Sequence, residues 1–406
     1  MSLLVAKFGG SSVASLEKIH NVADRIAEMK GQGNDVVVVV SAMGDMTDDL
    51  LELAGNIGKN LDNREMDMLL ATGEQQSASL LALTLAAGGC PAVSLTGWQA
   101  GVKSDDQHSK ARIIGLDTAR IRDELDKGKA VIIAGFQGIS PAGEITTLGR
   151  GGSDTTAVAL AADLQADRCM IFTDVDGVYT ADPRIVKEAR QLSSITYEEM
   201  LEMASLGAGV LQPRAAEFAM LYGVDVEVRS SFNNNPGTII TEVAKMERQR
   251  SVSGVAHDCN VARIALFDVP DQPGVASIIF KILADNHINV DMVIQSAMRD
   301  DRNDIAFTIE RNEFQKARAV VNEIVMKIGA SGMSYSVDVA KVSVVGAGMQ
   351  SNPGVAATMF DALARKDINI HMISTSEIKI SCIIDEDEME AAVQVLHDRF
   401  HLGETD

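Results

Sequence analysis

An internal duplication in the last third of the chain constrains the fold more than any other sequence feature. The tetrapeptide Pro-Gly-Val-Ala occurs at 273–276 and again at 353–356, and the match continues without a gap at an offset of 80 residues. Identical pairs include Phe280/Phe360, Leu283/Leu363, Ile288/Ile368, Asn289/Asn369 and Met292/Met372. Each copy predicts a short strand, a Pro-Gly turn, an amphipathic helix and a second strand, at 288–294 and 368–373. The duplication therefore predicts two small α+β units in tandem.

The residues before the repeat alternate between short apolar runs and helical stretches. The apolar runs are Leu3–Phe8, Val36–Val40, Ala92–Thr96, Ala130–Phe136, Met170–Thr173 and Val224–Val228. The helical stretches include Leu16–Met29, Asp67–Ala87, Thr156–Ala162 and Glu198–Ala204. This alternation predicts a three-layer α/β domain with a mostly parallel sheet covered on both faces. We expect that domain at 1–245, a linker and first regulatory strand at 246–260, and the repeat units at 261–338 and 339–406.

Charge and cysteine content exclude several classes of protein. The 36 basic and 57 acidic residues leave a formal net charge of −21, which disfavours nucleic acid and anionic membranes as partners. No apolar run approaches the ~20 residues of a membrane span, and the N-terminus lacks a signal-peptide pattern. The four cysteines are far apart in sequence, so we expect free thiols in a reducing compartment. These features predict a cytoplasmic protein.

Candidate binding residues follow the apolar runs, because ligands bind at the carboxyl ends of parallel strands. The first run ends in Lys7, Phe8, Gly9 and Gly10. Adjacent glycines allow a tight turn whose amides approach an anion, and Lys7 adds a charge, so this segment predicts a phosphate site or an ordinary turn. It matches neither the GxxxxGK[ST] nor the GxGxxG motif.

Two further segments have the same character. Arg150 is flanked by glycines, which leaves its guanidinium free to bind a carboxylate or phosphate, whereas Ser153 and Asp154 are alternatively helix caps. Residues 173–184 combine three carboxylates with Tyr179 and Arg184, which fits a nucleotide site or an acidic surface loop but not the ligand spacing of an EF-hand.

A glycine inside a predicted helix is a further indication of a functional site. Gly73 costs about 1 kcal/mol relative to alanine in a helix, which indicates close packing or a function. Its neighbour Glu74 is either a functional residue or a charged side chain exposed to solvent on the helix. Ser41 and Thr47 follow the second apolar run.

Together these motifs resemble the aspartate kinases of the amino acid kinase superfamily, in the monofunctional form with tandem C-terminal ACT domains. The resemblance rests on KFGGSSV at the start, VVSAMG at 39–44, TGE at 72–74, TTLGRGGSDTTA at 146–157 and TDVDGVYTADPR at 173–184. It implies ATP-dependent phosphorylation of the β-carboxylate of L-aspartate, the first step of lysine, threonine and methionine biosynthesis.

The resemblance also implies a role for each matching residue. Lys7, Glu74 and Asp154 are expected to act in catalysis, with Asp154 orienting Lys7. ATP, with Mg²⁺ that no protein side chain is expected to hold, is assigned to Lys7, Phe8, Gly9, Gly10, Ser41, Ser153, Thr173, Asp174, Tyr179, Thr180, Ala181, Asp182, Pro183 and Arg184. Aspartate is assigned to Thr47, Glu74, Arg150, Gly151, Gly152 and Ser153. Many relatives have a lysine at the position of Gly209, so Arg184, Lys187 or Mg²⁺ is expected to supply that charge.

The ACT resemblance implies feedback by lysine, threonine or both. The expected effector residues are Asp271, Gly274, Val275, Ala276, Asn289, Val290, Asp291 and Gln295 in the first unit, and Val355, Ala356, Asn369, Ile370, Ser376 and Glu377 in the second. Alternatively, any of these residues has only a structural role in the fold. We expect a homodimer, or a hetero-oligomer with a separate regulatory chain that starts at Met246.

Three other functions fit parts of the pattern. A kinase for glutamate or another small carboxylate would share the fold, and a catalytically weak amino-acid sensor would keep the ACT units. An NAD-dependent dehydrogenase is disfavoured, because the Gly-Ala-Gly at 346–348 lacks the third glycine of a dinucleotide site. No general base is expected, since a carboxylate acceptor is already ionised at pH 7 and phosphoryl transfer needs chiefly positioning and charge neutralisation.

Overall fold

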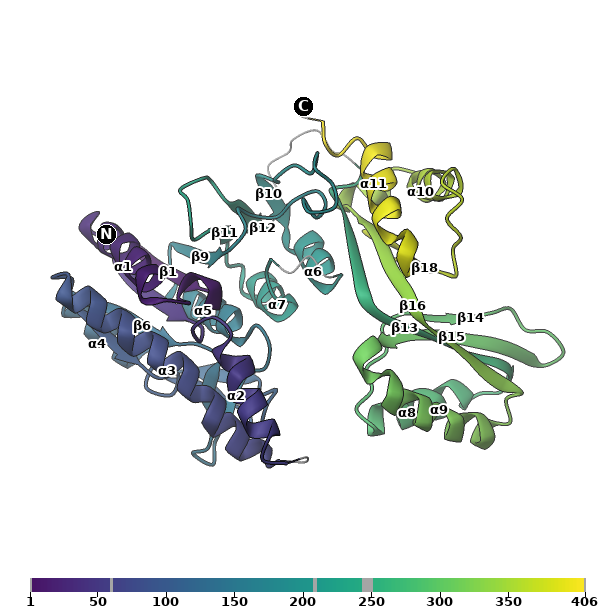
Figure 1. Ribbon diagram of the computed structural model, residues 1–406, viewed down its shortest axis with the longest axis horizontal. Coiled ribbons are helices and arrows are strands. Elements are labelled where there is room, and N and C mark those ends of the chain that lie inside the picture. The colour runs from purple at the N-terminus through teal and green to yellow at the C-terminus, as the bar shows by residue number, and fades with distance from the viewer. Residues whose placement is uncertain (1, 59–60, 207–209, 243–250, 405–406) are drawn as a thin grey trace. The chain divides into compact units, whose positions relative to one another are not determined.

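The structure, a computed structural model, describes residues 2–58, 61–206, 210–242 and 251–404 (Figure 1). The chain forms two compact units: Met1–Val178 with Gln191–Met246, and Tyr179–Arg190 with Glu247–Asp406. The sequence pattern places residues 179–190 in the first domain. They belong instead to the second unit, because Ala181 and Val186 are buried in its hydrophobic core.

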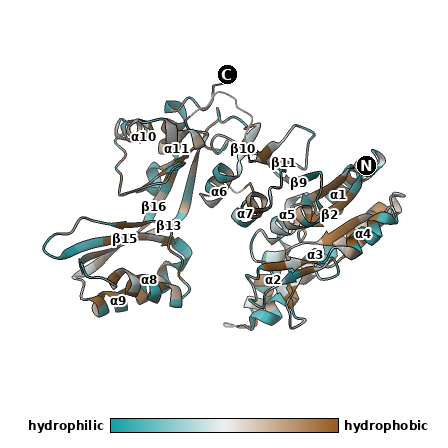
Figure 2. Cartoon of the chain, turned by 180° about the vertical axis from the view of Figure 1, so that it is seen from behind, coloured by the Kyte–Doolittle hydropathy of each residue, from teal (hydrophilic) through white to brown (hydrophobic). Residues whose placement is uncertain are grey.

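The first unit is built on an eight-stranded sheet in the order β10-β12-β11-β9-β1-β2-β6-β3. Its strands are β1 (Leu3–Phe8), β2 (Asp35–Val40), β3 (Ala92–Leu95), β6 (Ala130–Ala134), β9 (Arg168–Thr173), β10 (Ser194–Thr196), β11 (Val226–Ser230) and β12 (Thr238–Thr241). Every neighbouring pair is parallel except β11 with β12, which confirms the mostly parallel sheet. The valines of β2 are fully buried, and this strand is coloured hydrophobic in Figure 2.

Helices cover this sheet. They are α1 (Leu16–Gly31), α2 (Met46–Gly55), α3 (Asn63–Ala87), α4 (Ala119–Asp126), α5 (Gly152–Leu164), α6 (Tyr197–Ser205) and α7 (Pro213–Tyr222). Helices α1 and α3 pack against the side chains of Leu4, Ala6 and Phe8, whereas α5 contacts β1, β2 and β9. Helix α5 begins four residues before the predicted Thr156, because the preceding Gly151 is left-handed (φ 71°) and starts the helix there.

A four-stranded sheet, in the order β5-β4-β7-β8, completes the first unit. Its strands are β4 (Val102–Ser104), β5 (Ile113–Leu116), β7 (Gln137–Ile139) and β8 (Ile145–Thr147). The sequence did not predict this sheet, because strands of three or four residues are too short to show a periodic pattern. Strand β8 leads directly into the glycine-rich turn that carries Arg150.

The second unit contains a six-stranded antiparallel sheet in the order β14-β15-β13-β16-β18-β17. The strands are β13 (Gly254–Pro270), β14 (Val293–Gln295), β15 (Arg302–Glu310), β16 (Gly332–Val345), β17 (Met372–Thr375) and β18 (Lys379–Asp385), and the helices are α8 (Val275–Asp285), α9 (Phe314–Ile328), α10 (Val355–Ala364) and α11 (Met389–Arg399). Strands β14 and β17 begin four to five residues later than predicted, because Ile288 and Ile368 are buried in the loops that follow the helices.

The two repeats share this sheet. The first residues of β13, Gly254–Asp258, pair with the last of β16, whereas the rest of β13 pairs with residues 332–339. The expected division at 338/339 therefore falls inside β16. Each repeat still has its own core, and the repeat-equivalent Met292 and Met372 pack together in a third cluster.

The core of the first repeat provides a test of the packing. Phe307 on β15 is fully buried and meets Phe280 edge-to-face, with ring centroids 6.0 Å apart. We expect Phe307→Ala to lower the free energy of unfolding of the second unit by about 3–5 kcal/mol, measured by urea denaturation, because a large cavity is left. Met326→Ala, at a side chain 77% exposed on α9, is the control and should change it by less than about 0.5 kcal/mol. Equal effects of the two variants would contradict this core.

Candidate active site

A buried ion pair lies at the carboxyl edge of the eight-stranded sheet. Lys7, next to last in β1, places its Nζ 2.5 Å from Oδ1 of Asp154 in the first turn of α5, and the two side chains are only 11% and 9% exposed. The positive end of the α5 dipole and the Lys7 ammonium therefore face the same region, which favours a bound anion. The ion pair joins the two residues whose interaction the family resemblance implies.

The glycine turn after β1 is closely packed, and at Gly10 it leaves no room for a side chain. A Cβ on Gly10 would lie 2.9 Å from the carbonyl oxygen of Ala42 and 3.0 Å from that of Gly44. A Cβ on Gly9 would lie 3.5 Å from Nζ of Lys7. Ser41, half-buried, donates its backbone N–H to the carbonyl of Phe8 at 3.1 Å. The turn thus brings the ends of β1 and β2 together beside the lysine.

The phenyl ring of Phe8 points into the core. It stacks on Phe172 with ring centroids 4.6 Å apart and is fully buried. Any contact of this residue with a ligand would therefore come from its backbone, since its side chain is enclosed in the sheet core.

Gly73 and Glu74 join α3 to the end of β2. A Cβ on Gly73 would lie 2.8 Å from Cβ of Ala42, so the glycine allows the close packing that its sequence position indicates. Oε1 of Glu74 accepts the N–H of Ala42 at 3.2 Å. Its Oε2 is buried without a hydrogen-bond partner in the described chain, and burial raises the pKa of this carboxyl to about 7. A cationic group of a ligand would satisfy this oxygen. Thr47 lies in the first turn of α2, which packs on α3.

Arg150 is presented by a turn with two left-handed glycines, Gly149 (φ 77°) and Gly151 (φ 71°). Its side chain is exposed and makes no ion pair or hydrogen bond within the residues the structure describes. The turn leads into Gly152 and Ser153, both buried at the start of α5. Arg150 is thus free to bind an anion at the same helix end as Asp154.

The third predicted segment is divided between the units. Thr173 ends β9 and donates its hydroxyl to the exposed Asp174 at 3.0 Å, and both belong to the first unit. Residues from Tyr179 onward belong to the second unit. The hydroxyl of Thr180 lies 3.0 Å from Nε2 of His397, and Ala181 is in the hydrophobic core.

The remaining predicted site residues of this segment are exposed or half-buried. Tyr179 is half-buried, Pro183 is exposed, and the Arg184 guanidinium binds Asp182, which lowers the pKa of that carboxyl. Lys187 is exposed. Gly209, the expected departure from the family pattern, lies outside the described residues.

A cavity of about 510 Å³ in the second repeat unites four predicted effector residues: Val355, Ala356, Ser376 and Glu377. Asn369 and Ile370 do not line it. In the first repeat, Asp291 is ion-paired with the buried Nζ of Lys341 at 2.6 Å. The other predicted residues of that repeat lie around the start of α8, before β14 or on it: Asp271, Gly274, Val275, Ala276, Asn289, Val290 and Gln295.

Sequence reasoning missed several side chains near these turns. Asp67 is completely buried seven residues before Glu74 on α3, a spacing that puts both carboxylates on one helix face. The seven-residue spacing between these two carboxylates is the sequence feature that indicates Asp67. Ser12 was also missed, and its hydroxyl lies 2.5 Å from that of Ser231, a contact between residues 219 positions apart that no local pattern predicts.

Metal and membrane features were searched over the described ranges. They contain no group of three or more His, Cys, Asp or Glu side chains arranged to hold a metal ion. Among these same residues, no helix has the length and apolar character needed to cross a bilayer. All four cysteines are free thiols.

Comparisons with known proteins agree with this architecture. The amino acid kinase family matches residues 2–230, and the ACT domain matches residues 268–324 and 342–400. The aspartokinase of Geobacillus stearothermophilus is 51% identical over 404 residues, covering 100% of this chain and 98% of the relative. Aspartokinase 2 of Bacillus subtilis (strain 168) is 51% identical over 403 residues, covering 99% and 98%.

A solved structure extends the similarity to three dimensions. E. coli aspartokinase III in complex with aspartate and ADP has a TM-score of 0.83 at 25% identity, over 98% of this chain and 99% of the other. The sheet, the glycine turns and the paired repeats thus define an amino acid kinase joined to ACT domains. Within that class, the chain belongs to the aspartokinases.

The raised pKa of Glu74 makes a testable contribution to stability. Its pKa is about 7 in the fold and 4.5 for an ordinary glutamate. Ionisation of Glu74 therefore lowers the free energy of unfolding as pH rises from 4.5 to above 7, by roughly 3 kcal/mol at the upper end. Glu74→Gln removes this cost. We expect the difference in free energy of unfolding, variant minus wild type, to be more favourable to the variant at pH 8 than at pH 4.5. Urea unfolding without ligands measures it. A stability difference that is the same at both pH values would contradict the buried, ionisable Glu74.

Proposed function

We propose that this aspartokinase transfers the γ-phosphoryl group of ATP to the β-carboxylate of L-aspartate at the carboxyl edge of the eight-stranded sheet. The proposal rests on two charged groups that lack a partner among the described residues. They are the exposed guanidinium of Arg150 and the buried Oε2 of Glu74. An α-amino acid offers one carboxylate and one ammonium, which match these two groups. The complex of the E. coli relative with aspartate and ADP supports the choice of substrates.

Aspartate is held through its α-carbon groups, so that its side chain is free to react. Arg150 binds the α-carboxylate, and Glu74 with Thr47 binds the ammonium. The ammonium stabilises the ionised form of Glu74, whose second oxygen otherwise lacks a partner. Gly151, Gly152 and Ser153 border the β-carboxylate at the start of α5.

The nucleotide binds beside Lys7. The amide of Gly10 approaches the phosphates, whereas the N–H of Gly9 already donates to the carbonyl of Phe172 at 3.2 Å, so Gly9 contributes close approach through its missing side chain. Ser41, Ser153, Thr173 and Asp174 line the same strand ends, and Phe8 contributes only its backbone. The family resemblance also assigns to the nucleotide a set of residues from the second unit, of which Thr180 and Ala181 have only their backbone available because their side chains are buried: Tyr179, Thr180, Ala181, Asp182, Pro183 and Arg184. Mg²⁺ supplies additional neutralisation of the phosphates and is held mainly by phosphate oxygens and water.

Catalysis rests on neutralised charge and alignment. An oxygen of the aspartate β-carboxylate attacks the γ-phosphorus with its lone pair, and the bond to the β–γ bridging oxygen breaks, leaving ADP and 4-phospho-L-aspartate. Lys7, fixed by Asp154 at 2.5 Å, stabilises negative charge on the transferred group together with the α5 dipole. No proton has to move, so no general base takes part.

The paired ACT repeats bind a feedback amino acid, lysine or threonine or both. The cavity lined by Val355, Ala356, Ser376 and Glu377 has a size suited to an amino acid. E. coli aspartokinase III, whose structure was also solved with lysine and aspartate, has a TM-score of 0.75 at 25% identity over 98% of this chain. Glu377 provides a carboxylate for an effector ammonium.

Assembly and location complete the proposal. Strands β14 and β17 are the outer strands of the six-stranded sheet, and Val293 and Ile373 on them are 50% and 41% exposed. Open strand edges with exposed apolar side chains favour pairing with another chain. We therefore propose a homodimer, or a hetero-oligomer with a separate regulatory chain, in the cytoplasm.

Arg150 provides the direct test of the substrate site. We expect Arg150→Ala to raise the KM for aspartate by roughly 30-fold or more, because a charged hydrogen-bonded contact contributes about 2 kcal/mol, while the KM for ATP changes little. The acyl phosphate is trapped with hydroxylamine, and ADP release is followed with aspartate, glutamate or no acceptor.

The exposed Arg120 on α4 offers a matched control, and Arg120→Ala should leave both KM values unchanged. Turnover with glutamate in preference to aspartate would replace the proposed acceptor. No trapped product from the wild-type enzyme would favour an amino-acid sensor.

The effector cavity yields a separate prediction. We expect Ala356→Phe to fill the cavity and raise the lysine or threonine concentration for half-inhibition at least tenfold, with kcat unchanged in the absence of effector. Ala357→Phe, at the neighbouring exposed position outside the cavity lining, is the control. Ala276→Phe tests the equivalent position of the first repeat. Inhibition that survives Ala356→Phe but not Ala276→Phe would move the effector site to the first repeat.

A further inference from the structure

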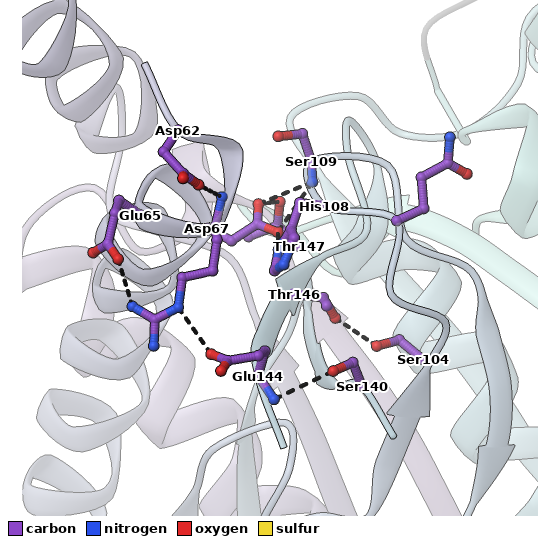
Figure 3. Close-up of polar contacts among 12 residues, drawn as sticks. Asp62, Glu65, Asp67, Ser104, His108, Ser109, Ser140, Glu144, Thr146 and Thr147 are labelled. Atoms are coloured by element: carbon purple, nitrogen blue, oxygen red, sulfur yellow. Dashed lines mark hydrogen bonds and ion pairs between the residues drawn. The ribbon is translucent and has the colours of Figure 1, made fainter. Parts of the chain in front are cut away.

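The most completely enclosed carboxylate of the first unit lies outside the residues assigned above. Asp67 has no exposed surface and accepts hydrogen bonds from the Thr147 hydroxyl at 2.5 Å and from the Ser109 N–H at 3.0 and 3.1 Å. Nδ1 of His108 lies 2.7 Å from its other oxygen. Figure 3 shows these side chains converging on Asp67. A buried carboxylate costs several kcal/mol unless such contacts satisfy it, so a role beyond simple packing is indicated.

The contacts of Asp67 join three separate pieces of chain. Asp67 itself is on α3, the helix that also carries Glu74 two turns further on. His108 and Ser109 belong to the connection between β4 and β5, and Thr147 is the last residue of β8. Asp67 therefore ties the helix of the proposed ammonium-binding residue to the segment that leads to Arg150.

The connection held by Asp67 packs against the turn that carries Arg150. Ser109 has a left-handed backbone (φ 67°), an unfavourable conformation for a serine, and its carbonyl oxygen would lie 3.2 Å from a Cβ placed on Gly149. The N–H of Ala111 donates to the carbonyl of Thr147 at 2.9 Å. Arg214 of α7 donates to the carbonyls of Leu148 and Ala111 at 2.5 and 3.0 Å. The residues before Arg150 are thus held by the β4–β5 connection and by α7, whereas the Arg150 side chain makes no hydrogen bond or ion pair with the described residues.

We propose that Asp67 is a positioning residue for the substrate: through Thr147 and Ser109 it holds the turn at 149–151 so that Arg150 stands at a fixed place relative to Glu74. Only two residues separate Thr147 from Arg150, so a displaced Thr147 moves the guanidinium. The proposal rests on the assignment of Arg150 to the aspartate α-carboxylate.

The hydroxyl of Thr147 allows a test that preserves the carboxylate. We expect Thr147→Val to raise the KM for aspartate 5- to 20-fold, with kcat and the KM for ATP changed less than threefold, because only the placement of Arg150 is loosened. Thr147→Ser restores the hydroxyl and should return the KM for aspartate to within twofold of the wild type. Steady-state kinetics at saturating ATP give the split between KM and kcat.

The neighbouring Thr146 is a matched control. It is buried on the same strand, and its hydroxyl lies 2.5 Å from that of Ser104, away from Asp67 (Figure 3). Thr146→Val therefore loses a comparable hydrogen bond and should leave the KM for aspartate unchanged. If it raises that KM as much as Thr147→Val does, or if Thr147→Val lowers only kcat and the melting temperature, Asp67 is merely structural and the proposal is overturned.

A second pair of variants tests the network from its other side. His108→Asn keeps a donor near the position of Nδ1 and should keep the KM for aspartate, whereas His108→Ala should raise it several-fold. Arg150→Ala distinguishes a wrong substrate site from a wrong role for Asp67. If it leaves the KM for aspartate unchanged, the substrate site itself is misassigned; if it raises that KM while the Thr147 and His108 variants do not, only the role of Asp67 fails.

Discussion

The buried ion pair between Lys7 and Asp154 is the interaction on which the catalytic unit depends. It joins the end of β1 to the start of α5, and the enclosed ammonium needs a partner because an isolated buried charge is costly. The start of α5, Lys7 and the turn at Gly9 and Gly10 all lie at the carboxyl edge of the eight-stranded sheet. The proposed binding of two negatively charged substrates there is compatible with the net charge of −21, because charges more than about 8 Å away are screened at physiological salt.

The site is completed by close backbone packing rather than by additional charges. Gly10 and Gly73 both approach Ala42, so the ends of β1 and β2 and the helix α3 meet where a side chain would collide. This contact fixes Glu74 against the Ala42 amide and leaves its second oxygen facing inward without a partner. The same helix places Asp67 under the Arg150 turn. One rigid helix thus sets the distance between the proposed ammonium and carboxylate sites.

The second unit shows how a duplicated sequence becomes a single structural element. Strands β13 and β16 are long enough to serve both repeats, so the two cores share one sheet. The segment 179–190 packs into the core around α10 and α11, the core that also contains Val355 of the effector cavity. Residues proposed to contact the nucleotide and residues proposed to contact the effector therefore belong to one packed body.

The sequence alone determined the parallel sheet, the two duplicated α+β units and the glycine turns with Lys7 and Arg150, because periodic burial and glycine placement are local properties of the chain. It also indicated Gly73 as a position of close packing. Tertiary structure alone decided that residues 179–190 join the second unit, that the ring of Phe8 is enclosed, and that Asp67 braces the Arg150 turn. Those outcomes depend on contacts between segments tens to hundreds of residues apart, and such contacts leave no periodic signal in the chain.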